Sequence, residues 1–301
     1  MTWRIIHITN VDKLSLNTNN LQIKKVDTEV TIPLGDIYAL IIEDLKISLT
    51  TRLLVELSYY NILVLFCNQK HLPECILTPV SGHFNQYAQT SKQLEWNENR
   101  KDKLWELLIK QKIHNHNYIL KNNGAEAVRI SKMNDLAESV YLQDVENIEG
   151  QAARYFYNTF YTDFTRDNDE LIENAVLNYG FSILHSAIAR TIVAKGLIPA
   201  IGVHHVGARN HFNLASDLIE PFRPLVDLLQ ITDPPPEGYL TREYRIKLIN
   251  LMHARVTIDN KRHTVIRAIE IMVQSIIDYF EDGKEEKLKL PTLDNYEFYE
   301  L

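Results

Sequence analysis

The sequence predicts an α+β protein, in which a β-rich, sandwich-like domain precedes a larger, all-α domain that carries the chemistry. Short runs with partial alternation fill residues 1–78, and the chain-breaking residues Pro79-Val-Ser-Gly82 follow them. Beyond this point the apolar residues recur at helical spacing over long stretches. We therefore place the β-rich domain at residues 1–80 and the helical domain at residues 81–301.

In the β-rich part, five short runs separated by turn residues are predicted strands: Trp3–Ile8, Lys13–Leu16, Leu21–Lys25, Glu29–Pro33 and Ile37–Ile42. A helix is expected to begin within Ser48–Thr51, because apolar residues at helical spacing follow it. The continuous apolar run Ile62–Phe66 is typical of a buried strand. We interpret this domain as structural, without chemistry of its own.

The second part has apolar stripes among many charged residues, which is typical of helices packed on a core. The predicted helical segments are Phe84–Lys112 as one or two helices, Asn115–Leu120, Ala125–Leu142, Val145–Phe160, Glu170–Ala194 and Asn260–Glu281. The stretch Pro234–Gly238 is an expected exposed loop. The aromatic and acidic tail Pro291–Leu301 is expected to be a docking or disordered segment.

The composition is that of an ordinary globular protein, with 301 residues, 45% hydrophobic and 24% charged. Cys67 and Cys75 lie outside any zinc-type spacing, so we expect a reducing, cytoplasmic environment. We find no signal peptide and no apolar run of the ~20 residues that a membrane span needs. The net charge of −7 argues against binding nucleic acid by bulk charge, but it leaves room for a local basic surface.

The segment from Ile198 to Pro224 is the strongest candidate for a functional site. It places His204 and His205 on a stretch bounded by proline and glycine, ahead of a helix-like run. In that run, Asp217 and Glu220 are three residues apart and so share one face. Carboxylates near neutral imidazoles in a partly buried place are suitable ligands for a divalent metal ion.

Glu149 is the candidate for a further ligand from elsewhere in the chain. It is followed by Gly-Gln-Ala-Ala-Arg154, and the small residues indicate close packing of this predicted helix. An unpaired carboxylate in such a place would be costly, and a bound metal ion would remove that cost.

These motifs resemble those of a known family. Glu149 in Glu-Gly-Gln-Ala-Ala-Arg, His205 after Pro199-Ala-Ile-Gly202, and Glu220 in Asp-Leu-Ile-Glu-Pro-Phe-Arg-Pro resemble the three metal-binding motifs of CRISPR-associated protein one, the integrase of CRISPR spacer acquisition. The segment from Asn213 to Asp227 is similar to the branch that accompanies type II systems. The resemblance extends over essentially the whole chain, although His211 replaces a common proline and Ser216 a common aspartate.

The resemblance implies a metal-dependent transesterification that joins the 3′-hydroxyl ends of captured DNA fragments to the borders of the CRISPR repeat, with an associated DNA endonuclease activity. It implies that Glu149, His205 and Glu220 are catalytic and bind Mg²⁺ or Mn²⁺. His204, Asp217, Arg209, Arg223 and His211 are further candidates for contacts to a metal ligand or to phosphate.

The resemblance also implies partners. These are double-stranded DNA fragments, CRISPR leader–repeat DNA, and a second copy of the chain bound through the β-rich domain. A dimer of the small CRISPR-associated protein two would bridge two such homodimers. The type II resemblance adds an accessory adaptation protein and the RNA-guided effector, and no membrane is involved.

Two other functions stay open from the residues alone: a free-standing metal-dependent DNA nuclease in repair, and a non-catalytic DNA-binding scaffold. Each candidate also has an ordinary structural interpretation, in which Glu149 pairs with Arg154, Glu220 pairs with Arg223, and the histidines are structural. The basic residues of the first long helices are interpreted as a solvated face, with a DNA-backbone track as the alternative: Lys92, Arg100, Lys101, Lys103, Lys110 and Lys112.

Overall fold

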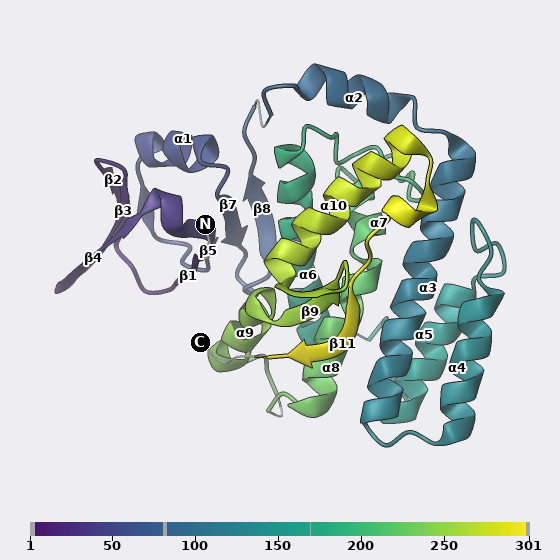
Figure 1. Cartoon of the computed structure of the whole chain (residues 1–301). Coiled ribbons are helices and arrows are strands. Elements are labelled where there is room, and N and C mark those ends of the chain that lie inside the picture. The colour runs from purple at the N-terminus through teal and green to yellow at the C-terminus, as the bar shows by residue number, and fades with distance from the viewer. Residues whose placement is uncertain (1–3, 81–82, 169, 237, 299–301) are drawn as a thin grey trace. The chain divides into compact units, whose positions relative to one another are not determined.

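The computed structural model describes residues 4–80, 83–168, 170–236 and 238–298. The chain forms two compact units, Met1–Gln86 and Tyr87–Leu301. The first is rich in strands and the second is largely helical, which confirms the predicted α+β fold class (Figure 1). Trp3 of the first predicted strand, Ser81 and Gly82 of the predicted boundary, and the last three residues of the tail lie outside the described residues.

The first unit contains two four-stranded sheets, ordered β1-β5-β7-β8 and β4-β3-β2-β6. In the first sheet β1, β5 and β7 run parallel and β8 is antiparallel. The elements of the first unit, in chain order, are β1 (Arg4–Ile8), β2 (Lys13–Asn17), β3 (Asn20–Lys25), β4 (Thr28–Pro33), η1 (Leu34–Asp36), β5 (Ile37–Ile42), β6 (Ser48–Leu49), α1 (Thr51–Tyr59), β7 (Leu63–Cys67) and β8 (Pro73–Leu77).

One apolar core holds these two sheets and α1 together. All six residues of β5 are buried, as expected for a central strand between two parallel neighbours. Leu14 and Leu21 from the other sheet and Leu53 and Leu57 from α1 join the same cluster. The Thr50 side chain caps α1 by accepting from the amide of Leu53 at 3.3 Å, which is why the helix begins where the sequence predicts.

The second unit is built around long helices that pack on one another. Its helices are α2 (Gln86–Leu94), α3 (Glu98–Asn122), α4 (Ala127–Ser139), α5 (Ile148–Phe160), α6 (Ile172–Ala194), α7 (Asn213–Leu218), η2 (Glu220–Phe222), α8 (Arg223–Thr232), α9 (Arg242–Asn250), η3 (Leu251–His253), α10 (Val265–Asp282) and η4 (Glu285–Lys287). As expected, α6 buries residues on several sides. No helix of the described residues is both long and apolar enough to span a membrane.

The second unit also contains a small sheet that the sequence did not predict. Its order is β10-β9-β11, with β9 (Arg255–Ile258), β10 (Lys261–Thr264) and β11 (Thr292–Glu297). The predicted helix from Asn260 is therefore wrong over its first residues. Those residues pair with β9, and α10 starts only after Thr264, whose Oγ1 accepts from the amide of Arg267 at 3.3 Å. The prediction that the tail is a docking or disordered segment is likewise wrong for β11, which pairs with β9.

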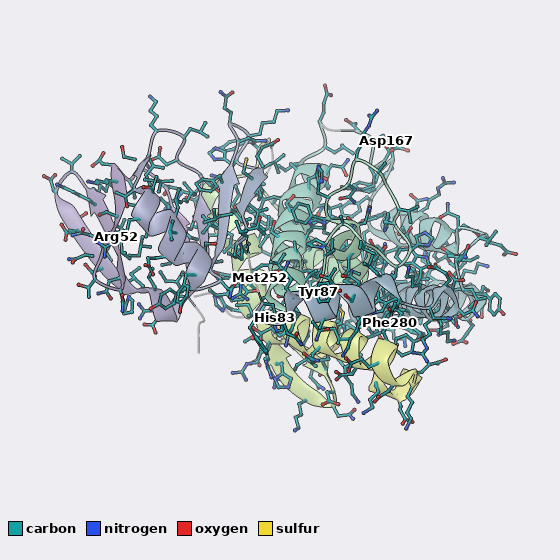
Figure 2. The ribbon with its side chains drawn as sticks, turned by 90° about the horizontal axis from the view of Figure 1, so that it is seen from above. Arg52, His83, Tyr87, Asp167, Met252 and Phe280 are labelled. Carbon is teal, nitrogen blue, oxygen red and sulfur yellow. The ribbon has the colours of Figure 1, made fainter. Side chains whose placement is uncertain are left out.

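A buried amide on α3 ties the helices of the second unit together. Asn115 Nδ2 donates to the carbonyl oxygens of Pro221 at 2.9 Å and Pro291 at 3.1 Å, and Asn115 Oδ1 accepts from the amide of Leu293 at 3.3 Å. These bonds fix η2 and the β11 segment against α3. Figure 2 shows the side chains of this unit as sticks and labels Tyr87 of α2 and Phe280 of α10.

Candidate active site

A cavity of about 350 Å³ in the second unit brings together most of the predicted site residues. Its walls come from α3, α5, α6, η2, α8 and the loop after α6. Glu149, His205 and Glu220 all line it, together with His204 and Arg223. Residues that are far apart in the sequence therefore meet at one place.

The two glutamates converge on one ammonium group. Lys112 Nζ of α3 donates to Glu149 Oε1 and, at 2.6 Å, to Glu220 Oε2. The other oxygen of Glu220 accepts from Arg223 Nε at 2.8 Å, so the pairing given as the ordinary structural alternative for Glu220 is present. The alternative pairing of Glu149 with Arg154 is wrong, because Lys112 is the cation bound to Glu149.

Burial and charge oppose each other in this cluster. Burial alone would raise the pKa of Glu220, but Arg223 and Lys112 lower it to about 2. Burial alone would lower the pKa of Lys112, but the attraction of Glu220 and Glu149 raises it above its usual value. Glu220, Lys112 and Arg223 are therefore charged at neutral pH.

The start of α5 is shaped to present Glu149. Asp144 accepts from the amides of Ile148 at 2.8 Å and Glu149 at 2.9 Å, and Asn147 accepts from the amide of Gly150 at 3.2 Å. These bonds satisfy the free amides of the first turn. A Cβ at position 150 would lie 2.7 Å from Asn147 Oδ1, so glycine here serves the cap.

Asp217 holds the histidine loop in place. Its carboxylate accepts from the amides of Val203 at 2.7 Å, His204 at 3.2 Å and His205 at 3.0 Å, and from His205 Nδ1 at 2.6 Å. The side-chain hydrogen bond to Asp217 raises the pKa of His205. A Cβ at Gly202 would clash with this carboxylate. The sequence predicted that Asp217 and Glu220 share one helix face. In the structure the Asp217 carboxylate binds the histidine loop, whereas Glu220 binds Lys112 and Arg223.

His204 forms a wall of the cavity. Its ring stacks on Trp105 of α3 with centroids 4.1 Å apart and an interplanar angle of 1°. Burial lowers the pKa of His204, so this ring is suited to remain neutral. Arg209 and His211, by contrast, do not line the cavity.

Several residues of the cavity were not among the predicted site residues. Asp227 Oδ1 accepts from the Tyr157 hydroxyl at 2.8 Å, and Asp227 Oδ2 is 3.0 Å from His116 Nε2. Burial and the nearby Asp227 raise the pKa of Tyr157. Arg166 is held by two neutral amides, donating to Asn174 at 2.6 Å and to Asn178 at 2.8 Å.

No spacing in the sequence could have linked these residues, because they lie on α3, α5, α8 and the loop before α6. One signal was available for Asp227, which ends the segment that resembles the type II branch. Lys112 was assigned to a solvated face, and this is wrong because its side chain is only 7% exposed.

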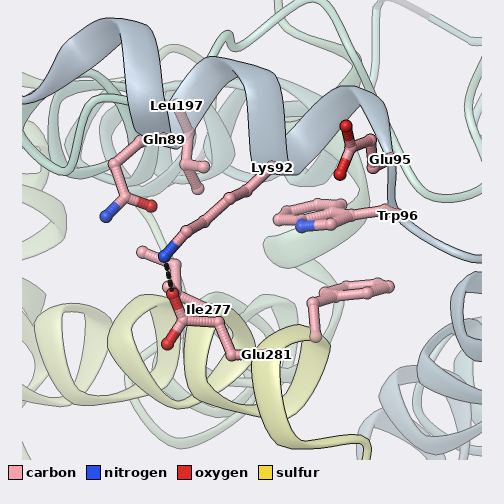
Figure 3. Close-up of a pocket in the computed structure, with 8 residues that line it drawn as sticks. Gln89, Lys92, Glu95, Trp96, Leu197, Ile277 and Glu281 are labelled. Atoms are coloured by element: carbon pink, nitrogen blue, oxygen red, sulfur yellow. Dashed lines mark hydrogen bonds and ion pairs between the residues drawn. The ribbon is translucent and has the colours of Figure 1, made fainter.

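A second cavity of similar volume, about 370 Å³, lies between α2 and α10 (Figure 3). There Trp96 stacks on Phe280 with centroids 4.0 Å apart, and Lys92 Nζ pairs with Glu281 Oε1 at 2.5 Å. This cavity pairs Glu281 with Lys92, and its second acid, Glu95, does not converge with Glu281 on a shared cation. Volume therefore does not distinguish the two cavities, whereas the converging carboxylates do.

The donor set of the first cavity suits a divalent metal ion. Among the described residues no three His, Cys, Asp or Glu side chains are close enough together to hold a metal ion as they stand. However, Glu149 and Glu220 already share one cation, the ammonium of Lys112. His205 uses Nδ1 toward Asp217, which leaves Nε2 for a ligand, the arrangement usual in metal-bound histidines. The predicted ligands therefore fit Mg²⁺ or Mn²⁺ chemically.

Comparison with known proteins identifies the family. The family model for CRISPR associated protein Cas1 matches residues 6–232. A CRISPR-associated endonuclease Cas1 from Neisseria meningitidis serogroup C is 35% identical over 297 residues, covering 97% of both chains. One from Pyrobaculum aerophilum is 30% identical over 257 residues, covering 78% of this chain and 85% of the relative. The chain therefore belongs to the Cas1 family.

Solved structures share the fold. A CAS1 protein from Thermotoga maritima has a TM-score of 0.74 at 17% identity, with 93% of this chain and 97% of that chain covered. A casposase bound to an integration product also has a TM-score of 0.74, at 20% identity, with 95% and 92% covered. A chain of a Cas6-RT-Cas1–Cas2 complex has the same score at 19% identity, with 96% of this chain and 37% of that chain covered.

Proposed function

We propose that this chain is the integrase of CRISPR spacer acquisition, a metal-dependent enzyme that joins 3′-hydroxyl ends of DNA to the borders of a CRISPR repeat. The observation that carries the proposal is the convergence of Glu149 and Glu220 on a single cation. His205 lines the same cavity with Asp217 behind it. The endonuclease names of the curated Cas1 relatives support phosphodiester chemistry at this site.

The residues around the carboxylates are suited to a phosphodiester. Arg166 and Arg223 line the cavity with guanidinium groups, and these bind phosphate oxygens well. Arg166 contributes positive charge that its two neutral amide partners do not cancel. Within a chain whose net charge is −7, these two guanidinium groups supply local positive charge for a phosphate.

Glu149, His205 and Glu220 would hold the metal ion, and Asp217 would keep His205 in the tautomer that leaves Nε2 free. When bound, Mg²⁺ or Mn²⁺ supplies Lewis-acid stabilisation of the phosphate charge and lowers the pKa of the attacking hydroxyl. Arg166 would orient the phosphodiester, and Trp105 and His204 would exclude water on one side of the site.

The partners follow from the same proposal. Structures with a similar fold include a Cas6-RT-Cas1–Cas2 complex and a TtCas1–DNA complex, and we propose that this chain also binds DNA and a Cas2 dimer. We further propose that the β-rich unit forms a homodimer. Strand β4 is an edge of its sheet; Val30 within it is 50% exposed, and Val26 in the turn before it is 78% exposed. A type II accessory adaptation protein and the RNA-guided effector are further proposed associates.

A strand-transfer assay tests the proposed function. A short duplex with free 3′-hydroxyls is incubated with a supercoiled plasmid carrying a CRISPR leader and repeat, with Mn²⁺ or Mg²⁺ and with the Cas2 partner. The wild type is compared with His205→Ala and Glu220→Ala. Arg154→Ala is the matched control, because Arg154 is exposed on α5, five residues from Glu149.

We expect joined products at the repeat border for the wild type and for Arg154→Ala, and none for the other two variants or with chelator. Metal-dependent nicking without joining would indicate the repair nuclease instead. A chain that neither joins nor nicks DNA but still binds it would be the non-catalytic scaffold. Joining that survives both site substitutions would show that the active site lies elsewhere.

A further inference from the structure

The one cation that Glu149 and Glu220 share belongs to the chain itself. Lys112 reaches the two carboxylates from α3, and the residue as a whole is only 6% exposed. A buried ammonium is costly unless it is paired and hydrogen-bonded, and here two carboxylates from two different elements bind it. The ammonium lies where a cation ligated by both glutamates has to lie.

The charges of this cluster cancel without any bound ion. Glu149 and Glu220 carry two negative charges, and Lys112 and Arg223 carry two positive ones. A divalent ion added to these carboxylates repels the ammonium between them. Both cations cannot occupy the same position between the two oxygen atoms, so Lys112 Nζ has to leave it.

We propose that Lys112 is the resident counter-cation of the Glu149–Glu220 pair, which a divalent metal ion displaces into the cavity, where the ammonium binds the phosphate of the DNA. This inference rests on the proposed function, since it takes the two glutamates as metal ligands. The neutral cluster becomes strongly positive once the metal ion is bound. Metal and phosphate therefore bind cooperatively, each strengthening the other.

The test measures Mn²⁺ affinity by electron paramagnetic resonance of the free ion, without DNA. Lys112→Met removes the competitor, and we expect it to bind Mn²⁺ at least about tenfold more tightly than the wild type. Lys110→Met is the matched control. Lys110 lies on the same helix and its Nζ pairs with Glu106 at 2.8 Å, away from the cavity, so its removal should leave the affinity unchanged.

Adding a short DNA duplex tests the second half of the proposal, in which the displaced ammonium of Lys112 binds a phosphate of the DNA. In the wild type the duplex should tighten Mn²⁺ binding, and in Lys112→Met this gain should be smaller. Equal or weaker Mn²⁺ affinity in Lys112→Met would overturn the displacement, and an equal gain from DNA in both chains would overturn the phosphate contact.

Thermal melting keeps the proposal testable if Lys112→Met folds poorly. Lys112→Met leaves two carboxylates without their cation, so it should melt at a lower temperature than the wild type in chelator and recover with Mn²⁺. A Lys112→Met chain that stays unfolded with Mn²⁺ would show a purely structural lysine and overturn the proposal. Glu220→Ala tests the proposed metal site separately from the displacement of Lys112. If this variant binds Mn²⁺ as the wild type does, the proposed metal site itself fails.

Discussion

Two buried glutamates of the second unit, Glu106 and Glu220, are bound by the same kinds of groups and differ in what they are suited to do. Glu106 accepts from Lys103 at 2.9 Å, from Lys110 at 2.8 Å and from the amide of Leu142 at 3.2 Å. Two ammonium groups thus neutralise one carboxylate. At Glu220 two cations serve two carboxylates, and one of those cations is shared with Glu149.

The difference shows why burial and ion pairing do not by themselves mark a functional acid. The lysines at Glu106 are 29% and 25% exposed on their side chains, and Glu106 does not line the active-site cavity. The groups at Glu220 line a cavity that also contains an oriented histidine. This contrast supports a structural role for Glu106 and the proposed ligand role for Glu220.

Exchanging each acid for its amide should separate the two roles most strongly. Glu220→Gln removes a charge from the proposed metal site, so we expect Mn²⁺ affinity and strand transfer to fall more than about a hundredfold. Glu106→Gln should leave both within about twofold, because no proposed ligand contacts it. Calorimetric Mn²⁺ titration of both variants checks this, and similar losses in the two would break the comparison.

Asp217 should matter through His205. Asp217→Asn removes the carboxylate that accepts from His205 Nδ1, so the pKa of His205 should fall back toward its usual value. Misorientation of the ring should also weaken Mn²⁺ binding by about tenfold or more. Nitrogen-15 histidine spectra recorded against pH measure the first effect. An unchanged His205 titration would contradict the role assigned to Asp217.

Glu106 should show its effect in stability. Glu106→Gln leaves Lys103 and Lys110 without their carboxylate, and we expect the free energy of unfolding to fall by about 2 kcal/mol. The loss is moderate because water reaches both lysines. Urea denaturation measures it, and a change below about 0.5 kcal/mol would show that the cluster adds no net stability.

Acid should destabilise the Glu220 cluster over a defined range. The pKa of Glu220 is about 2 in the folded chain and 4.5 ordinarily, so its ionised form stabilises the fold fully above pH 4.5. That contribution, on the order of 3 kcal/mol, is lost as the pH falls toward 2. Urea midpoints in chelator between pH 6 and about 3 should fall less steeply for Glu220→Gln than for the wild type. Equal slopes would contradict the lowered pKa.

Local patterns predicted local structure well. The alternating runs predicted the strands of the first unit, and Thr50 ahead of an apolar stripe predicted α1. The same reasoning failed at two places. Residues 261–264 form a hairpin with β9 across the two-residue turn Asp259–Asn260, a local signal that helical spacing obscured. The tail forms β11, and its pairing with the distant β9 leaves no signal in the local sequence.

The site shows the same limit. Family motifs led to Glu149, His205 and Glu220, which line one cavity. The run of charged residues on the first long helices placed Lys112 on a solvated face, because a local charge run does not show what packs against each of its members. Only the folding of α5 and η2 against α3 gives Lys112 two carboxylates. The Asp227 network likewise depends on three separate helices.

The most direct test of the proposed ligand set is an anomalous difference map from crystals of the wild-type chain soaked in MnCl₂. We expect one strong peak about 2 Å from the carboxylates of Glu149 and Glu220 and from His205 Nε2, with Lys112 Nζ moved away from its position between the two glutamates. A peak elsewhere, with the ammonium still bridging Glu149 and Glu220, would contradict both the metal ligands and the role of Lys112.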